Sequence, residues 1–213
     1  ASYYIKSQEG ERITSSVTLA LSYDSTNDQM FPSKGIKATV SVQHAGMPLG
    51  GNAKFTKYTG SIAGYYPLFW DMVVGAKGRM GYLQNNDDND SRIPLYERYV
   101  LGGINSLRGL RYVGPVDSGT SDVIGGTTMV AFSLELVFPL IKNAGMKGVV
   151  FYDAGNTWNG GYYLDDLRMT CGAGVRWYSP IGPLRLEYGY VLDRRGLNDD
   201  ATGRWEFTLG MFM

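Results

Sequence analysis

Apolar and polar side chains alternate with a period of two along most of this chain. In residues 13–23, Val17, Leu19 and Leu21 alternate with Thr18 and Ala20. Such alternation is typical of strands with one apolar and one polar face. We predict nine strands, a further stub at residues 1–6, and no helix. The predicted strands span residues 13–23, 36–45, 53–69, 72–83, 127–140, 146–158, 167–178, 183–192 and 204–213.

The predicted turns alternate in length. Short turns follow the third, fifth and seventh strands, and longer polar loops follow the second, fourth, sixth and eighth. Alternating segments of about ten residues, joined by such turns and carrying aromatic residues near their ends, are typical of a transmembrane antiparallel β-barrel. In a bilayer every backbone donor and acceptor must be paired within the protein, which favours a closed sheet. The alternative all-β fold is a soluble sandwich of two sheets.

The two faces of the predicted strands differ in chemistry. In residues 183–192, the apolar Leu186 lies between Arg185 and Glu187. In a membrane barrel the apolar face meets lipid, and we expect the charged face to meet water in the lumen. The same alternation puts Cys171 on the lipid face, where we expect it to pack. Two more charged residues are expected in the wet lumen, Arg168 and Arg176.

One loop, residues 84–126, is too long and too apolar in its middle to be a simple connection. Loops of this length are usually functional or disordered. The segment from Leu101 to Pro115 contains Arg108, Arg111, several glycines and apolar side chains that a solvated linker does not need. We therefore predict that the loop folds back onto the barrel and that Arg108 pairs with a carboxylate. The apolar set is Leu101, Ile104, Leu107, Leu110, Tyr112 and Val113.

Composition narrows the possible functions. The 213 residues carry 20 Lys and Arg against 20 Asp and Glu, and a net charge of zero gives no reason to expect nucleic acid as a partner. A single histidine, His44, argues against histidine-based catalysis and multi-histidine metal sites, and a single cysteine rules out an intrachain disulfide. We expect no metal and no cofactor. No run approaches about 18 apolar residues. No signal peptide is present, so we expect the chain to start inside a larger protein.

Five segments carry recognisable motifs, at residues 21–35, 94–103, 107–110, 151–155 and 172–184. Taken in order, they resemble motifs of the BamA superfamily of outer-membrane assembly factors, and the resemblance covers nearly the whole chain. They are similar to the family's periplasmic turn, the segment that leads into its sixth extracellular loop, its VRGF/Y motif, its FxDxG strand motif and its penultimate hairpin. Two departures are Leu110, where an aromatic residue is usual, and the chain end at Phe212-Met213.

The resemblance implies a sixteen-stranded transmembrane barrel preceded by periplasmic POTRA domains. Residues 1–213 would form the C-terminal portion of that barrel, with the later strands only. A nine-stranded sheet has two open edges, which lipid does not tolerate, so we expect the chain to be part of a longer polypeptide. The family topology places the C-terminus and the short turns in the periplasm.

The resemblance also gives the long loop a docking place. It implies that loop 84–126 folds into the lumen. The family pattern puts Phe151, Asp153 and Gly155 inward, and the strand alternation adds Glu135. We expect charge-assisted, bidentate pairing of Arg108 with these carboxylates. The alternatives are a solvated Arg108, or docking that only stabilises the barrel. The docking motif is Leu107, Arg108, Gly109 and Leu110.

The function that the resemblance implies is non-enzymatic insertion and assembly of β-barrel proteins in the bacterial outer membrane. The family mechanism uses a weak lateral seam between the first and last strands. The implied partners are unfolded outer-membrane protein clients, accessory assembly lipoproteins and the lipid bilayer. The residues expected on the C-terminal seam strand are Trp205, Phe207, Leu209, Gly210 and Phe212.

Three other functions are weighed against this one. A two-partner polypeptide secretion pore belongs to the same superfamily. A passive porin would not need the Leu107–Leu110 and Phe151–Gly155 motifs. A barrel hydrolase would need Ser133 or Ser179 to act with the distant His44, which is poor geometry for a catalytic triad.

Overall fold

A computed structural model describes residues 13–29, 31–87, 93–120, 122–179, 182–195 and 202–210. In these ranges the chain forms one sheet of nine antiparallel strands, each paired with the next along the sequence. None of the helical turns in the same ranges has the length and apolarity to cross a membrane. The strands are β1 (Ser16–Asp24), β2 (Gly35–Ala45), β3 (Phe55–Pro67), β4 (Val73–Asn85), β5 (Thr128–Ile141), β6 (Met146–Trp158), β7 (Arg168–Ser179), β8 (Gly182–Val191) and β9 (Gly203–Leu209).

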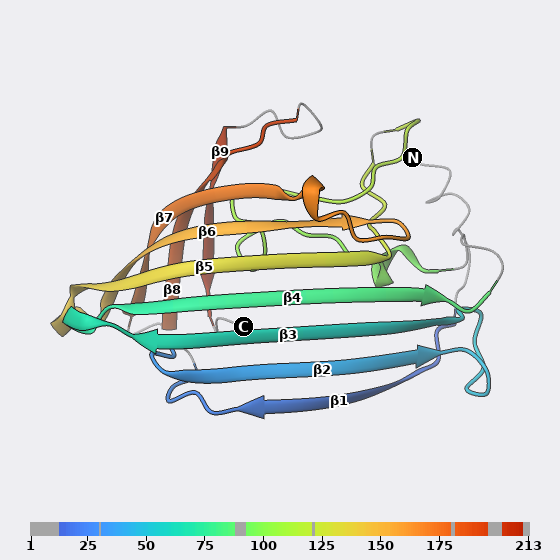
Figure 1. Cartoon of the computed structure of the whole chain (residues 1–213), viewed down its shortest axis with the longest axis horizontal. Helices are drawn as coiled ribbons and strands as arrows, with labels where there is room; N and C mark the ends of the chain where they lie inside the picture. The colour runs from blue at the N-terminus through green and yellow to red at the C-terminus, as the bar shows by residue number, and fades with distance from the viewer. Residues whose placement is uncertain are drawn as a thin grey trace.

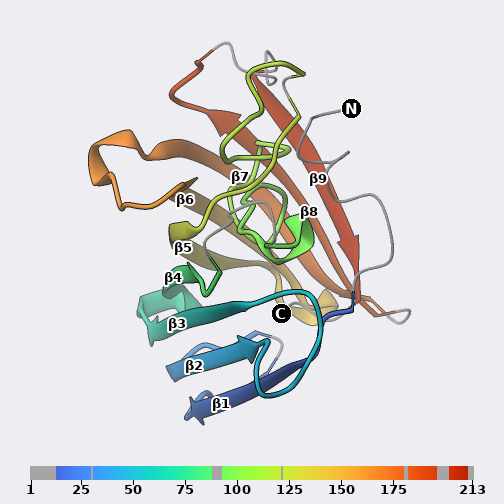
Figure 2. The same cartoon turned by 90° about the vertical axis from the view of Figure 1, so that its right-hand side faces the viewer.

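The sheet is strongly curved. Figure 1 shows β1 to β7 side by side, with β8 and β9 behind them, and Figure 2 shows that the sheet curls into an open trough. The segment between β4 and β5 lies on the concave side of this trough (Figure 2). In the described ranges β1 pairs only with β2, and β9 pairs only with β8. The predicted all-β, antiparallel architecture is confirmed.

The predicted strands match the observed ones closely, apart from a few ends. The strand expected at residues 53–69 stops at Pro67. Trp70 and Asp71 then reverse the chain in the 3-10 turn η1 (Phe69–Asp71), both with a φ of 58°. The strand expected at 204–213 ends at Leu209. The stub at residues 1–6 and residues 211–213 lie outside the described ranges.

Three further 3-10 turns interrupt the connections. They are η3 (Leu95–Glu97) in the long loop, η4 (Lys142–Ala144) after β5 and η5 (Leu164–Asp166) after β6. Lys142 of η4 donates a hydrogen bond of 2.5 Å to Asp71 of η1, and this bond lowers the pKa of the exposed Asp71 carboxyl. The two neighbouring turns at this end of the sheet are therefore linked by an ion pair.

The outer face of the sheet is apolar and exposed, and the inner face is charged and buried. Leu186, which points outward from β8, is 45% exposed, whereas Arg185 and Glu187 beside it are 5% and 0% exposed. The expectation that Arg185 and Glu187 meet open water is therefore wrong, because the long loop covers this part of the inner face (Figure 2). Other exposed apolar side chains on the strands include Leu19, Leu21, Ile62, Tyr66, Phe132 and Leu134.

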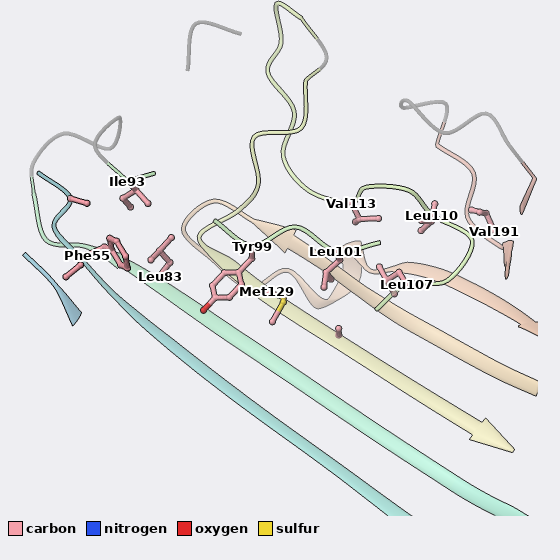
Figure 3. Packing of buried hydrophobic residues seen from close by; sticks show 13 residues of the cluster. Phe55, Leu83, Ile93, Tyr99, Leu101, Leu107, Leu110, Val113, Met129 and Val191 are labelled. Carbon is pink, nitrogen blue, oxygen red and sulfur yellow. The ribbon is translucent and has the colours of Figure 1, made fainter. Parts of the chain in front are cut away.

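The long loop brings its own apolar side chains to the concave side. Leu107 and Leu110 are fully buried there, and full burial of a leucine is worth about 1.5–3 kcal/mol. Figure 3 shows loop and strand side chains in one buried cluster. The loop is therefore a packed part of the fold. The labelled members of this loop–strand cluster are Phe55, Leu83, Ile93, Tyr99, Leu101, Leu107, Leu110, Val113, Met129 and Val191.

The orientation of β8 gives a prediction about its outer face. In the full-length protein folded in a bilayer, we expect Leu186→Arg to lower the free energy of unfolding by about 2–4 kcal/mol, because the charge is placed in hydrocarbon. Leu192→Arg, just beyond the end of β8, is the matched control and should cost about 0–1 kcal/mol. Urea titration of both variants measures the difference. Equal and small losses would show that the outer face of β8 does not meet lipid.

Candidate functional site

The loop between β4 and β5 is built as a hairpin whose tip carries the docking motif. Tyr99 and Gly126 exchange two backbone hydrogen bonds of 2.9 and 2.8 Å, and Leu101 and Val113 exchange two of 3.0 and 2.7 Å. Gly103 N–H donates to the carbonyl of Leu110 at 2.8 Å. These pairs satisfy backbone donors and acceptors of a segment that lies outside the sheet, and they hold the tip of the loop in one position.

Arg108 is the centre of the docked tip, and all five of its guanidinium N–H groups have acceptors. Nε and Nη2 bind the two oxygens of Asp153 at 2.7 and 2.6 Å, a bidentate contact. Nη1 donates to Glu135 at 2.7 Å and to Glu187 at 2.9 Å, and Nη2 also donates to Ser133 at 2.8 Å. Because a guanidinium has five donors in a fixed plane, no lysine could reproduce this set of contacts.

The same guanidinium lies on an aromatic ring. The Cζ atom of Arg108 is 3.5 Å from the centroid of the Phe151 ring, and the backbone N–H of Arg108 donates to Asp153 at 3.2 Å. Arginine stacked on an aromatic face gains a further electrostatic attraction, which is larger away from water. Arg108 is only 2% exposed. Phe151 and Asp153 of β6 thus hold both the face and the edge of one side chain.

Two strand arginines complete a charge cluster around Arg108. Arg176 donates from Nε to Glu187 at 2.8 Å and from Nη2 to Glu135 at 2.8 Å. Arg185 donates to both oxygens of Glu187 at 2.7 and 3.0 Å, and to the backbone carbonyl of Ile104 at 2.9 Å. Buried charges are tolerated only when they are paired and hydrogen-bonded. The members of this lumen cluster are Arg108, Arg176, Arg185, Glu135, Asp153 and Glu187.

Glycines on β7 make room for the lumen cluster. A Cβ atom at Gly172 would lie 2.5 Å from the Phe151 ring, and one at Gly174 would lie 2.5 Å from Cγ of Glu187. In the register, Gly172 is opposite Phe151 and Gly174 is opposite Glu187. Any larger residue at these two positions would displace a side chain that contacts Arg108. The absence of side chains at these two glycines of β7 is therefore a structural requirement of the lumen cluster.

The structure places the remaining predicted residues as follows. Leu107 and Leu110 lie on either side of Arg108 in the loop–strand cluster. Gly155 is opposite Ala131, where a Cβ would lie 2.6 Å from the carbonyl of Val130. Gly210 follows β9 with a φ of 118°. Phe212 lies outside the described residues. Three of the residues predicted for the seam strand lie on the exposed outer face of β9: Trp205, Phe207 and Leu209.

Sequence reasoning missed part of the lumen cluster. It paired Arg108 with Asp153 and Glu135 only, but Glu187 and Ser133 also accept hydrogen bonds from it, and Arg176 and Arg185 bind the same carboxylates. The period-two alternation already placed Glu187 on the inner face. The position of Glu187 along the barrel axis relative to Glu135 depends on the stagger of the four strands from β5 to β8, which the alternation does not reveal.

Ser133 and His44, two residues of the hydrolase alternative, have other partners in the described ranges. In the part of the chain that the structure describes, no group of three or more His, Cys, Asp or Glu is arranged to hold a metal. The Ser133 hydroxyl accepts a hydrogen bond from Arg108, and His44 contacts Thr56 and the carbonyl of Met47. The described geometry thus assigns Ser133 to loop docking.

The lumen cluster gives a prediction about loop stability. Removing one member leaves buried charges unpaired, so we expect Arg108→Ala and Asp153→Ala each to destabilise docking by about 3–5 kcal/mol. The loop should then be cleaved by protease in the full-length protein while the barrel stays folded. The double variant should be little worse than either single variant, because the two residues are coupled.

Arg108→Lys tests the geometry of the contact. An ammonium keeps the charge but not the planar fork, so protease protection should return only in part. Simple addition of the Arg108→Ala and Asp153→Ala effects, or full protection by lysine, would contradict the coupled, bidentate arrangement.

Comparisons with known proteins agree with this architecture. The sequence matches the Omp85 superfamily domain over residues 1–213. It is 32% identical to the outer membrane protein assembly factor BamA of Nitratidesulfovibrio vulgaris, covering 100% of this chain and 27% of that protein. It is 31% identical to the human sorting and assembly machinery component 50 homolog, covering 90% of this chain and 44% of that protein. The chain thus spans less than half of the length of either relative.

A solved structure shows the same fold. The crystal structure of BamA from Haemophilus ducreyi lacking POTRA domains 1–3 superposes with a TM-score of 0.81 at 24% identity. The match covers 100% of this chain and 48% of that chain. The nine strands, the loop between β4 and β5 and the family match lead to one conclusion: the chain belongs to the Omp85 superfamily and has the fold of part of a BamA-type β-barrel.

Proposed function

We propose that the protein containing this chain inserts and assembles β-barrel proteins in the bacterial outer membrane. Membership of the Omp85 superfamily and similarity to assembly factors from a bacterium and from human support this function. Residues 1–213 form the C-terminal portion of the transmembrane barrel in this proposal. Unfolded outer-membrane proteins are the clients, and accessory lipoproteins and lipid are further partners.

The observation that carries the proposal is the docked loop. A passive pore functions best with an open lumen, but here the loop lies on the concave side and its tip is fixed by the lumen cluster. A loop that only closed the barrel would not need a guanidinium with five acceptors. The arrangement instead suits a lumen that must keep one shape while the barrel wall changes.

The outer strand β9 is the proposed site of client contact. Within the described ranges β9 pairs with β8. In this proposal its other edge forms the lateral seam with the first strand of the full barrel, and an opened seam offers backbone donors and acceptors. An extended client strand can add to such an edge by backbone hydrogen bonding, with its apolar side chains turned toward lipid. Trp205, Phe207 and Leu209 on the outer face of β9 continue that apolar surface.

The proposal also sets the orientation in the membrane. The short turns after β3, β5 and β7, and the C-terminus, lie on the periplasmic side. The loop after β4 begins on the extracellular side and folds inward. The clients therefore arrive at the end of the sheet that carries η1 and η4, where the POTRA domains of the full-length protein would receive them.

Assembly in reconstituted membranes tests this function. In proteoliposomes with the full-length protein, we expect Arg108→Ala to reduce the yield of folded client strongly, because the loop is released from the lumen. The exposed Arg111, three positions along the same loop, is the matched control, and Arg111→Ala should be mild. The yield is measured as heat-modifiable, protease-protected client.

Two results would overturn the proposal. If Arg111→Ala is the more damaging change, the loop acts at the extracellular surface and not in the lumen. If the wild-type protein moves a polypeptide across the bilayer without inserting it, the secretion alternative replaces the assembly function.

A further inference from the structure

We propose that Glu206 is a positioning residue that couples the docked loop to strand β9. Glu206 points inward from β9 and is 9% exposed. Its Oε1 atom accepts a hydrogen bond of 3.0 Å from the backbone N–H of Gly109, the residue after Arg108. A charged acceptor makes a stronger hydrogen bond than a neutral one, so this contact joins the loop tip directly to the proposed seam strand.

Glu206 stands opposite a second buried carboxylate. In the β8–β9 register, Glu187 and Glu206 are direct partners, and both side chains lie on the inner face. Like charges directly opposite on one face destabilise a strand pair. Glu187 is balanced by Arg108, Arg176 and Arg185, as described above. The pairing of β8 with β9 therefore depends in part on cations from other elements, Arg108 of the loop and Arg176 of β7.

The buried charge of Glu206 is balanced by fewer contacts than that of Glu187. Its second oxygen, Oε2, is buried and has no hydrogen-bond partner in the described part of the chain. A buried polar atom without a partner costs free energy, and a buried charge costs more. The hydrogen bond from Gly109 is consequently a large share of what stabilises this carboxylate on β9.

The backbone geometry explains how Gly109 reaches β9. The φ of Gly109 is 92°, a value that favours glycine, and a Cβ on it would lie 2.6 Å from the carbonyl oxygen of Gly189. A Cβ on Gly189 would in turn lie 2.4 Å from the carbonyl carbon of Arg108. The loop backbone thus lies against the backbone of β8, and only glycine at both positions allows this approach.

The state of the loop and the state of β9 are therefore linked. When the loop leaves the lumen, Glu206 loses its donor and Glu187 loses Arg108, so two carboxylates face each other across the β8–β9 pair. The pair is then weakened next to the edge where, on the proposed function, clients bind. Since coupling free energies are reciprocal, removing the Glu206 carboxylate must also loosen the loop.

Hydrogen exchange of β9 in the full-length protein in lipid tests this link without any client. Asp153→Asn releases the loop and alters neither β8 nor β9. When residue 206 is glutamate, we expect Asp153→Asn to speed hydrogen exchange of the β9 amides by roughly fivefold or more, a typical allosteric coupling. The acceleration should be smaller in a Glu206→Gln background, which removes the opposed charge, and smallest in Glu206→Leu.

The reciprocal effect is read from protease cleavage of the loop. Glu206→Leu should increase cleavage by roughly tenfold, the value of one lost charged hydrogen bond. Glu206→Gln keeps an acceptor for Gly109 and should restore most of the protection. Thr208→Val, on the same face of β9, is the control and should leave the loop protected.

Two outcomes would overturn the inference. One is that Asp153→Asn speeds β9 exchange equally with Glu, Gln or Leu at position 206. The other is no acceleration with Glu206 present. Because neither readout uses a client, the link can fail while the assembly function stands. Loss of client assembly with the exchange pattern intact would overturn the function alone.

Discussion

One arginine, buried on the concave side of the sheet, determines how this structure is put together. Arg108 is brought by a loop, yet every acceptor that it uses comes from the barrel wall, from β5, β6 and β8. The cost of burying its charge is offset only if all of these acceptors are in place together. The loop conformation, the stagger of the strands and the glycines of β7 are therefore parts of a single geometric requirement.

The need to pair these buried groups explains why side chains are packed on the concave side of the sheet. A barrel wall turns its apolar face outward, so its inner face carries polar groups that need partners. The docked loop supplies arginine to the carboxylates and leucines to the apolar positions near the end of the lumen. Charged and apolar contacts then act together, because both hold the same short segment, residues 107–110, on the inner face.

The sequence predicted the strands and their faces well, and predicted the site in part. Period-two alternation is a local property, so strand positions, and the inward direction of Glu135 and Glu187, could be derived without tertiary information. Asp153 came from a motif. The contact of Arg108 with Glu187, and that of Gly109 with Glu206, depend on strand stagger and on the path of a long loop, which are both non-local. The burial of Arg185 was predicted wrongly for the same reason, since alternation cannot show what covers a face.

The most direct test of the account is whether the loop tip resides in the lumen in a native membrane. Leu110 of the loop and Val191 of β8 belong to the same buried cluster (Figure 3). With the native Cys171 replaced by serine, Leu110→Cys and Val191→Cys in the full-length protein should be joined efficiently by a short thiol cross-linker. Adding Asp153→Asn should greatly reduce the product. A cross-link that does not form, or that is indifferent to Asp153→Asn, would contradict an Arg108-dependent docked loop.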